Sequence, residues 1–286
     1  MSLLELPPVR RYGPPRTTFV LGGGGNLGAV QVGMVRALLE RGIRPDEIVG
    51  CSAGALNAAA LAADPTLSGA TRLERIWSSL GRTGVGPSTL FSHLRLFRSR
   101  SQGLSSNAGL RRLIAEYVPF STFEEAIVPF HVVAANLDTG RERWFSSGPL
   151  MEPVLASAAL PAVFPPVVIG GERYIDGAVV NNVPISKAVQ LGAERIFVLH
   201  VGNFDRPRPT PRRPIDVLLQ SFSISRNCRF LADSERPPPG VEMVILPGVD
   251  PGALRYNDFA QSSVLIERGY ETTMGFLEGM PIRAGG

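Results

Sequence analysis

Short apolar runs alternate with longer helical patterns along the chain. The runs are rich in β-branched residues and almost continuous in hydrophobicity, which is typical of parallel strands buried on both faces. The runs are Thr17–Leu21, Glu47–Val49, His131–Ala135, Arg195–Val201 and Glu242–Leu246. The helical patterns are Ala29–Glu40, Ala53–Ala63, Thr71–Leu80, Leu110–Tyr117, Met151–Leu160 and Pro184–Leu191. Strands and helices in this alternation predict an α/β fold with a parallel sheet covered on both faces.

Three segments depart from this rhythm. In Asn136–Phe145, the tripeptide Asp138-Thr139-Gly140 predicts a hairpin turn into an antiparallel strand. Gly81–Ser105 mixes Gly, Ser and Arg around a few large apolar residues, and Arg206–Pro214 is rich in Pro and Arg. We expect one domain over residues 1–286, with its motifs in 17–201 and a C-terminal extension over 202–286, in which Ile215–Gly286 adds helices around a last strand.

The composition is that of a folded globular protein, with 44% hydrophobic and 19% charged residues. The net charge of +4 is small, and no predicted helix combines clustered cations with aromatic residues, which argues against a nucleic-acid partner. The longest apolar stretch, Ala55–Ala63, is shorter than the roughly 18 residues that a membrane span requires. Because the N-terminus also lacks a secretory pattern, we expect a cytoplasmic protein, with peripheral membrane contact left open.

Cysteine and histidine are too scarce and scattered to form a metal site. Cys51 and Cys228 cannot make a disulfide framework, and His93, His131 and His200 share no ligand spacing. We therefore expect chemistry without a metal or a cofactor.

A glycine-rich loop, Gly22–Gly28, follows the first strand and precedes the first helix. Four consecutive glycines allow a tight turn whose N–H groups converge beside a helix N-terminus, which makes a cradle for an anion. Gly23, Gly25 and Gly28 fit the dinucleotide pattern, but the end of the second strand carries no ribose-binding acid. The bound anion is a phosphate or the transient oxyanion of acyl transfer.

Gly50-Cys51-Ser52-Ala53-Gly54 matches the G-x-S-x-G pattern at the junction of a strand and a helix. At such an elbow the serine is the nucleophile, and the flanking glycines avoid a collision with the crossing backbone. A small-residue turn with a capping serine gives the same pattern without catalysis. Cys51 is expected to point away from the cleft as a buried thiol.

Asp176 is the candidate base for Ser52. It ends a short apolar strand, and Gly177 leaves room for the serine to approach, while Asn181 or Asn182 is placed to orient the loop backbone. A carboxylate has to be desolvated to act as a base toward a hydroxyl. His200, at the end of another strand, offers a rival Ser-Asp-His arrangement.

Four segments resemble the patatin-like phospholipase family. They are GGGGNLG at 22–28, GCSAG at 50–54, the small-residue stretch Ala156–Pro166, and DGAVVNNVP at 176–184. The resemblance implies a three-layer α/β/α sandwich with a mostly parallel central sheet, and hydrolysis of lipid acyl esters without metal. It also implies a Ser-Asp dyad of Ser52 and Asp176, and an oxyanion hole formed by the backbone N–H groups of Gly23, Gly24 and Gly25. The glycines that support these motifs are Gly28, Gly50, Gly54 and Gly177.

The chain departs from the family at Leu27, where a basic residue is usual, and nothing after Val201 matches a family motif. Two other functions remain open, an acyltransferase using the same nucleophile and a non-catalytic lipid- or nucleotide-binding protein. In addition, Leu90, Phe91, Leu94 and Phe97 share one helical face, which predicts a lid over the core or a contact with a membrane surface.

Overall fold

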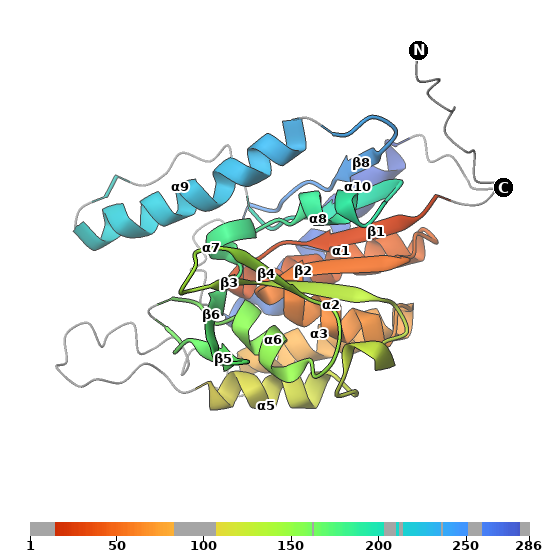
Figure 1. Ribbon diagram of the computed structural model, residues 1–286. Coiled ribbons are helices and arrows are strands. Elements are labelled where there is room, and N and C mark those ends of the chain that lie inside the picture. The colour runs from red at the N-terminus through yellow and green to blue at the C-terminus, as the bar shows by residue number, and fades with distance from the viewer. Residues whose placement is uncertain are drawn as a thin grey trace, which may run out of the picture.

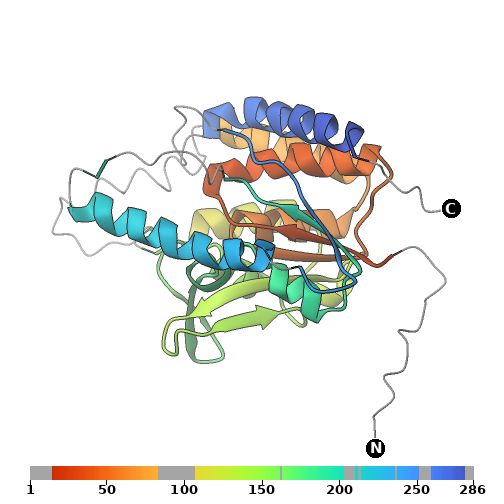
Figure 2. The same ribbon diagram turned by 90° about the horizontal axis from the view of Figure 1, so that it is seen from above.

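A central sheet lies between two layers of helices in the computed structural model of the protein (Figures 1 and 2). The structure describes residues 15–82, 107–161, 163–202, 210–211, 214–235, 237–250 and 259–280. The apolar face predicted at 90–97 and most of the Pro/Arg-rich segment lie outside these residues.

In the described residues the sheet has eight strands, whose hydrogen-bonded neighbours follow the order β5-β6-β3-β2-β1-β7-β8, with β4 also paired to β3. The strands are β1 (Thr17–Leu21), β2 (Glu47–Cys51), β3 (Phe130–Asn136), β4 (Glu142–Phe145), β5 (Val167–Ile169), β6 (Glu172–Asp176), β7 (Arg195–Leu199) and β8 (Glu242–Ile245). Neighbouring strands from β3 through β2, β1 and β7 to β8 run parallel. The pairings of β4 and β6 with β3, and of β5 with β6, are antiparallel. The predicted α/β fold with a mostly parallel central sheet is therefore confirmed.

Both faces of the central strands are buried, as their continuous hydrophobicity predicts. In β1, Phe19 and Leu21 pack into the larger core, whereas Val20 packs into a second core on the opposite face. β7 alternates in the same way, with Phe197 in the first core and Val198 in the second. Successive side chains of a strand point to opposite faces, so each apolar run supplies both layers.

In the part of the chain that the structure describes, six helices cover the larger core. They are α1 (Gly28–Glu40), α2 (Ala53–Ala63), α3 (Leu67–Arg82), α5 (Ala108–Tyr117), α6 (Met151–Ser157) and α10 (Ser262–Glu278). Helix α10 lies along α1 (Figure 2), and the crossing is close because Gly33 and Gly269 have no side chains. A Cβ on Gly33 would collide with the carbonyl oxygen of Ile266, and one on Gly269 with that of Val30. The C-terminal segment thus completes this layer.

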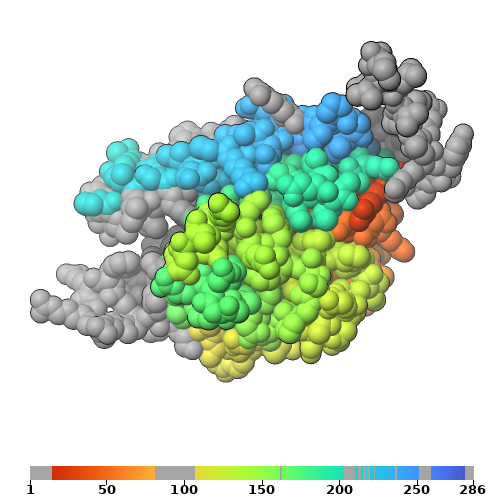
Figure 3. All heavy atoms as spheres, in the orientation of Figure 1, coloured from red at the N-terminus to blue at the C-terminus, as the bar shows by residue number. Residues whose placement is uncertain are grey.

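The opposite face carries α7 (Ala178–Asn181), α8 (Ile185–Gln190) and α9 (Pro214–Glu235). Helix α9 lies over this face and extends past the body of the protein at its N-terminal end (Figures 1 and 3). Short 3-10 turns occur at η1 (Gly25–Leu27), η3 (Phe123–Glu125) and η4 (Phe259–Gln261). None of the described helices is both long enough and apolar enough to cross a membrane.

The predicted hairpin is present, because β4 returns antiparallel to β3 after a turn in which Gly140 has a φ of 70°. The main difference from the sequence prediction is that α6 ends at Ser157 rather than at Leu160. Pro161 disfavours helical geometry at the residue before it, so the helix ends early. This early end turns the chain back toward the sheet beside Ser52, where Ser157 has a function of its own.

Candidate active site

Ser52 lies in the sharp turn between β2 and α2. It is the one non-glycine residue with a positive φ in the described part of the chain, with φ 55° and ψ −123°. Such a strained conformation is typical of the serine at a strand–helix elbow. The turn has no room for side chains on either side, because a Cβ on Gly54 would collide with the Leu21 carbonyl and one on Gly50 would lie 2.7 Å from the carbonyl oxygen of Gly54.

Strand β3 brings Asp176 to the end of β2. The last pair between β2 and β3 is Cys51 with Val133, and the pairing of β6 with β3 begins at the next residue, where Asp176 lies opposite Ala134. Alternate residues of a strand direct their backbone groups to opposite edges. The carbonyl of Pro129 accepts from the N–H of Ile48 in β2, and the N–H of Leu137 donates to the carbonyl of Arg173 in β6. Because Pro129 and Leu137 are an even number of positions apart along β3, β2 and β6 lie on the same edge of this strand. β6 therefore pairs with the same edge of β3 as β2 does, directly beyond the point where β2 ends.

The two side chains meet in a short hydrogen bond. The Ser52 Oγ donates to Asp176 Oδ2 at 2.6 Å, and the backbone N–H of Ala178 donates to Oδ1 at 2.8 Å. The Asp176 side chain is buried, and this burial raises its pKa from 3.8 to about 6, although the two hydrogen bonds and the positive charge of Arg226 act in the opposite direction. A carboxylate with this pKa is a much better proton acceptor near neutral pH than an exposed aspartate.

Ser157 links the backbones on both sides of this contact, a role that the sequence does not predict. Its Oγ accepts from the backbone N–H of Ser52 at 3.0 Å, and its carbonyl accepts from that of Gly177 at 3.3 Å. Its side chain is completely buried. The only signal in the sequence is a run of small residues, which gives no indication that one hydroxyl holds the elbow.

The glycine loop lies directly against the elbow, since a Cβ on Gly23 would be 3.0 Å from the Cβ of Ser52. The N–H of Gly23 donates to the backbone carbonyl of Asn182 at 2.9 Å, a bond that does not involve the asparagine side chain. This bond also occupies one of the three predicted oxyanion donors. Gly24 directly precedes η1 and Gly25 is its first residue, and Gly25 has a φ of 61°, so a glycine is needed there.

A buried polar network fixes the loop from the other side. The side-chain amide of Gln31 donates to the carbonyls of Gly22 and Leu199 at 2.7 and 2.9 Å. The Asn57 amide donates to Gln31 Oε1 at 2.8 Å and to the Gly28 carbonyl at 2.9 Å, and Asn57 Oδ1 accepts from Trp77 Nε1 at 2.8 Å. These bonds join α1, α2 and α3 to both ends of the glycine loop. In the sequence, Asn57 merely interrupts an apolar stretch.

The rival candidates do not join the dyad. His200 is buried against the Phe230 ring, with ring centroids 5.2 Å apart, and burial lowers its pKa to about 4. Cys51 is fully buried, which raises the pKa of its thiol well above the ordinary value, as expected for an inert residue. His131 bonds to Glu47, the first residue of β2, at the other end of that strand from Ser52, and His93 lies outside the described residues. Across the described ranges, no three His, Cys, Asp or Glu side chains gather where they would hold a metal ion.

Comparison with known families agrees with this architecture. The family model described as patatin-like phospholipase matches residues 19–189. Among curated relatives, the chain is 32% identical over 190 residues to a lysophospholipase of Aspergillus terreus, covering 66% of this chain and 12% of the relative. It is 31% identical over 197 residues to a lysophospholipase of Mycosarcoma maydis, covering 66% and 10%. The chain therefore spans about a tenth of the length of these relatives.

Solved structures with a similar fold include VipD from Legionella pneumophila. The match covers 93% of this chain and 67% of VipD, with 16% identity and a TM-score of 0.48. A human GIVD cytosolic phospholipase A2 matches 92% of this chain and 58% of its own, with 13% identity and a TM-score of 0.46. These distant likenesses do not bear on the chemistry of the site.

The buried network predicts a stability cost for Asn57→Leu. This change removes three hydrogen bonds and leaves Trp77 Nε1, Gln31 Oε1 and the Gly28 carbonyl without those partners inside the protein. We expect a loss of about 3 kcal/mol or more in the free energy of unfolding, measured by urea denaturation. Because the two amides share a bond, Gln31→Leu combined with Asn57→Leu should lose less than the sum of the single changes. Additive losses would contradict a single connected network.

The raised pKa of Asp176 predicts that Asp176→Asn stabilises the fold above pH 6. The carboxyl has a pKa of about 6 in the folded protein against 3.8 as the reference value, so the folded state binds the proton more tightly between these values. Stability of the parent protein therefore falls as the pH rises through this window, by about 3 kcal/mol in total. The variant lacks this titration. Its advantage in urea denaturation should be largest at pH 8 and should shrink toward pH 4, and a constant difference would contradict the assignment.

Proposed function

The chain belongs to the patatin-like phospholipase family, a family of lipid ester hydrolases, and we propose that it cleaves lipid acyl esters with Ser52 as nucleophile and Asp176 as base. The observation that carries the proposal is the 2.6 Å hydrogen bond from Ser52 Oγ to Asp176 Oδ2, made by a serine at a strained elbow. A buried carboxylate and an activated hydroxyl in contact are the two groups that acyl transfer to serine requires.

In the first step, Asp176 accepts the Ser52 proton while Oγ attacks the ester carbonyl carbon. The carbonyl oxygen takes up the electron pair and becomes an oxyanion. We assign the N–H groups of Gly24 and Gly25 as its donors, because that of Gly23 is bonded to Asn182. Preorganised donors of this kind stabilise developing charge without reorganisation.

Collapse of this intermediate breaks the ester bond, and the leaving alcohol receives the proton from Asp176. Water then attacks the acyl-enzyme as Asp176 accepts one of its protons, and the proton returns to Ser52 when the fatty acid leaves. The same carboxyl thus acts as base and acid in both halves of the reaction. With an alcohol in place of water, the second half is an acyl transfer, and analysis of products in the presence of glycerol distinguishes the two.

We propose a single-chain phospholipid as substrate, because the curated relatives are named lysophospholipases. Peripheral contact with a lipid surface fits this substrate. Exposed apolar side chains lie beside the site on β5 and α7, where Val168 is 61% and Val179 is 37% exposed. Both elements directly flank β6, the strand that carries Asp176.

Removal of the nucleophile is the direct test. Ser52→Ala should lower ester hydrolysis by at least about 10³-fold and abolish labelling by a fluorophosphonate, with an unchanged melting temperature. Cys51→Ala is the matched control, because Cys51 is the buried neighbour and should leave both labelling and activity intact. Hydrolysis that persists in Ser52→Ala, or labelling that disappears in Cys51→Ala, would refute the assignment.

The base is tested by the pH dependence of kcat/KM. Asp176 must be unprotonated in the free enzyme, so kcat/KM should rise with pH, level off above pH 6, and fall about tenfold per pH unit below it. His200 has a pKa lowered to about 4, so a profile controlled by His200 would stay flat down to that pH. A neutral monoacylglycerol is the substrate for this measurement, since its own charge does not change.

A further inference from the structure

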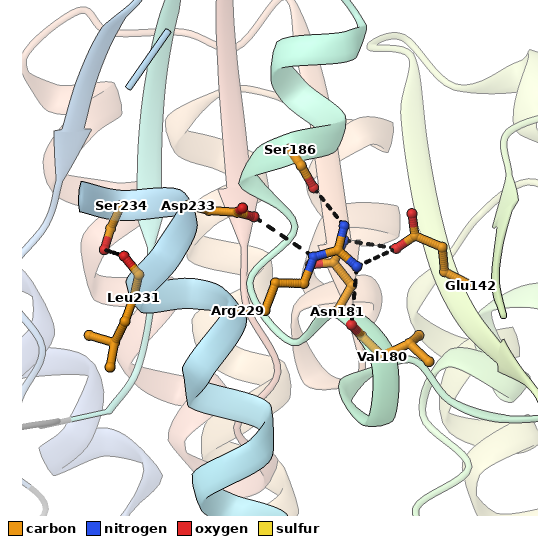
Figure 4. A network of polar contacts seen from close by, with 8 residues as sticks. All are labelled: Glu142, Val180, Asn181, Ser186, Arg229, Leu231, Asp233 and Ser234. Carbon is orange, nitrogen blue, oxygen red and sulfur yellow. Dashed lines mark hydrogen bonds and ion pairs between the residues drawn. The ribbon is translucent and has the colours of Figure 1, made fainter. Parts of the chain in front are cut away.

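Helix α9 is held to the body at Arg229, as Figure 4 shows. Its Nη1 donates to Glu142 Oε2 at 2.9 Å and to the Val180 carbonyl at 3.2 Å, and its Nη2 donates to Ser186 Oγ at 3.0 Å. The side-chain amide of Asn181 donates to the same Glu142 oxygen at 3.1 Å. One guanidinium therefore joins α9 to β4, α7 and α8.

The next residue, Phe230, fixes the rotation of α9 about its axis. Its side chain is buried and packs on the His200 ring, directly after β7 ends at Leu199. Arg229 and Phe230 therefore contact the body at two neighbouring directions around the helix. The Phe230 contact lies at the end of β7, whose last residue, Leu199, accepts from the N–H of Gly22 in the glycine loop.

Arg226 lies between these two directions, one turn nearer the N-terminus of α9. With about 100° per residue, position 226 falls between 229 and 230 on the helical wheel. Its side chain, which is partly buried, therefore lies on the side of α9 that faces the body. Consistent with this placement, its positive charge lowers the pKa of Asp176 and also that of Cys51.

The substrate determines which group such a cation binds. The ester of a lysophospholipid is separated from its phosphate by only a few covalent bonds, so a cation beside the dyad meets the head group rather than the acyl chain. Guanidinium groups bind phosphate through two parallel N–H bonds. The glycine loop at 22–28 itself contains no basic residue.

Building on the proposed function, we propose that Arg226 binds the phosphate of the substrate head group while the acyl ester lies against Ser52. The residue then selects phospholipids over neutral lipids of the same acyl chain. A different role, in which Arg226 only supports the charge of Asp176, would affect both kinds of ester equally.

The test compares two monomeric substrates with one acyl chain, a lysophosphatidylcholine and a monoacylglycerol, each below its aggregation concentration. At pH 8, where Asp176 is unprotonated, Arg226→Gln should lower the ratio of kcat/KM for the phospholipid to kcat/KM for the neutral ester by about 10- to 100-fold, the loss expected for a charged hydrogen-bond partner. For Arg226→Lys this ratio should fall between those of the parent protein and Arg226→Gln. Arg268→Gln is the matched control, because Arg268 is an exposed arginine of α10, in the other helix layer, and its loss should change neither rate.

A second measurement does not depend on turnover of the phospholipid. Glycerol 3-phosphate should inhibit hydrolysis of the monoacylglycerol by the parent protein and should lose this effect in Arg226→Gln. Equal losses on both substrates, or no loss on either, would overturn the phosphate assignment. Should Arg226→Gln not fold, the same two readouts on Arg226→Lys decide. Failure of the proposed function itself is recognised separately, because the parent protein would then cleave neither ester and Ser52 would not react with the fluorophosphonate.

Discussion

The register of β3 is the constraint on which the site depends. Strand β2 ends opposite Val133 and β6 ends opposite Ala134, so the two strands deliver Ser52 and Asp176 to one point from opposite directions. A shift of one residue in either pairing would turn the delivered side chain to the other face of the sheet. The cores on both faces prevent such a shift, because it would expose apolar side chains. The 2.6 Å contact is thus a consequence of packing across the whole sheet.

The geometry of the site destabilises the folded state, and hydrogen bonds around the site offset this loss of stability. Ser52 has strained backbone angles, and the Asp176 carboxyl is buried enough to raise its pKa to about 6. Both features disfavour the folded state in the conditions under which they are useful. Hydrogen-bonded polar groups support both features, with the Ser157 hydroxyl on the elbow and the Gln31 and Asn57 amides behind the glycine loop. Such networks are rigid because every loss leaves a buried group without its partner.

Local patterns predict the elements and the two candidate site residues, but not the groups that support those residues. The parallel strands and the positions of Ser52 and Asp176 follow from sequence because each depends on a short pattern of apolar or small residues. The hydrogen bond from the Gly23 N–H to the Asn182 carbonyl depends instead on two segments that are far apart in the chain. Ser157 is missed for the same reason, since a serine among alanines has no distinctive spacing. The antiparallel pairing of β6 with β3, directly beyond the end of β2, likewise depends on the tertiary structure.

The part of the chain outside the family match is closely built into the site. The family match ends at residue 189. Arg229 lies beyond it on α9, yet it donates to Glu142 and to the Val180 carbonyl inside the matched region. Conversely, α10 supplies one side of the core against α1. The matched region therefore contributes Ser52 and Asp176, and the following helices contribute their surroundings. A charge placed by α9 acts on Asp176 through space, so the electrostatics of the dyad are set partly by residues that the family motifs do not include.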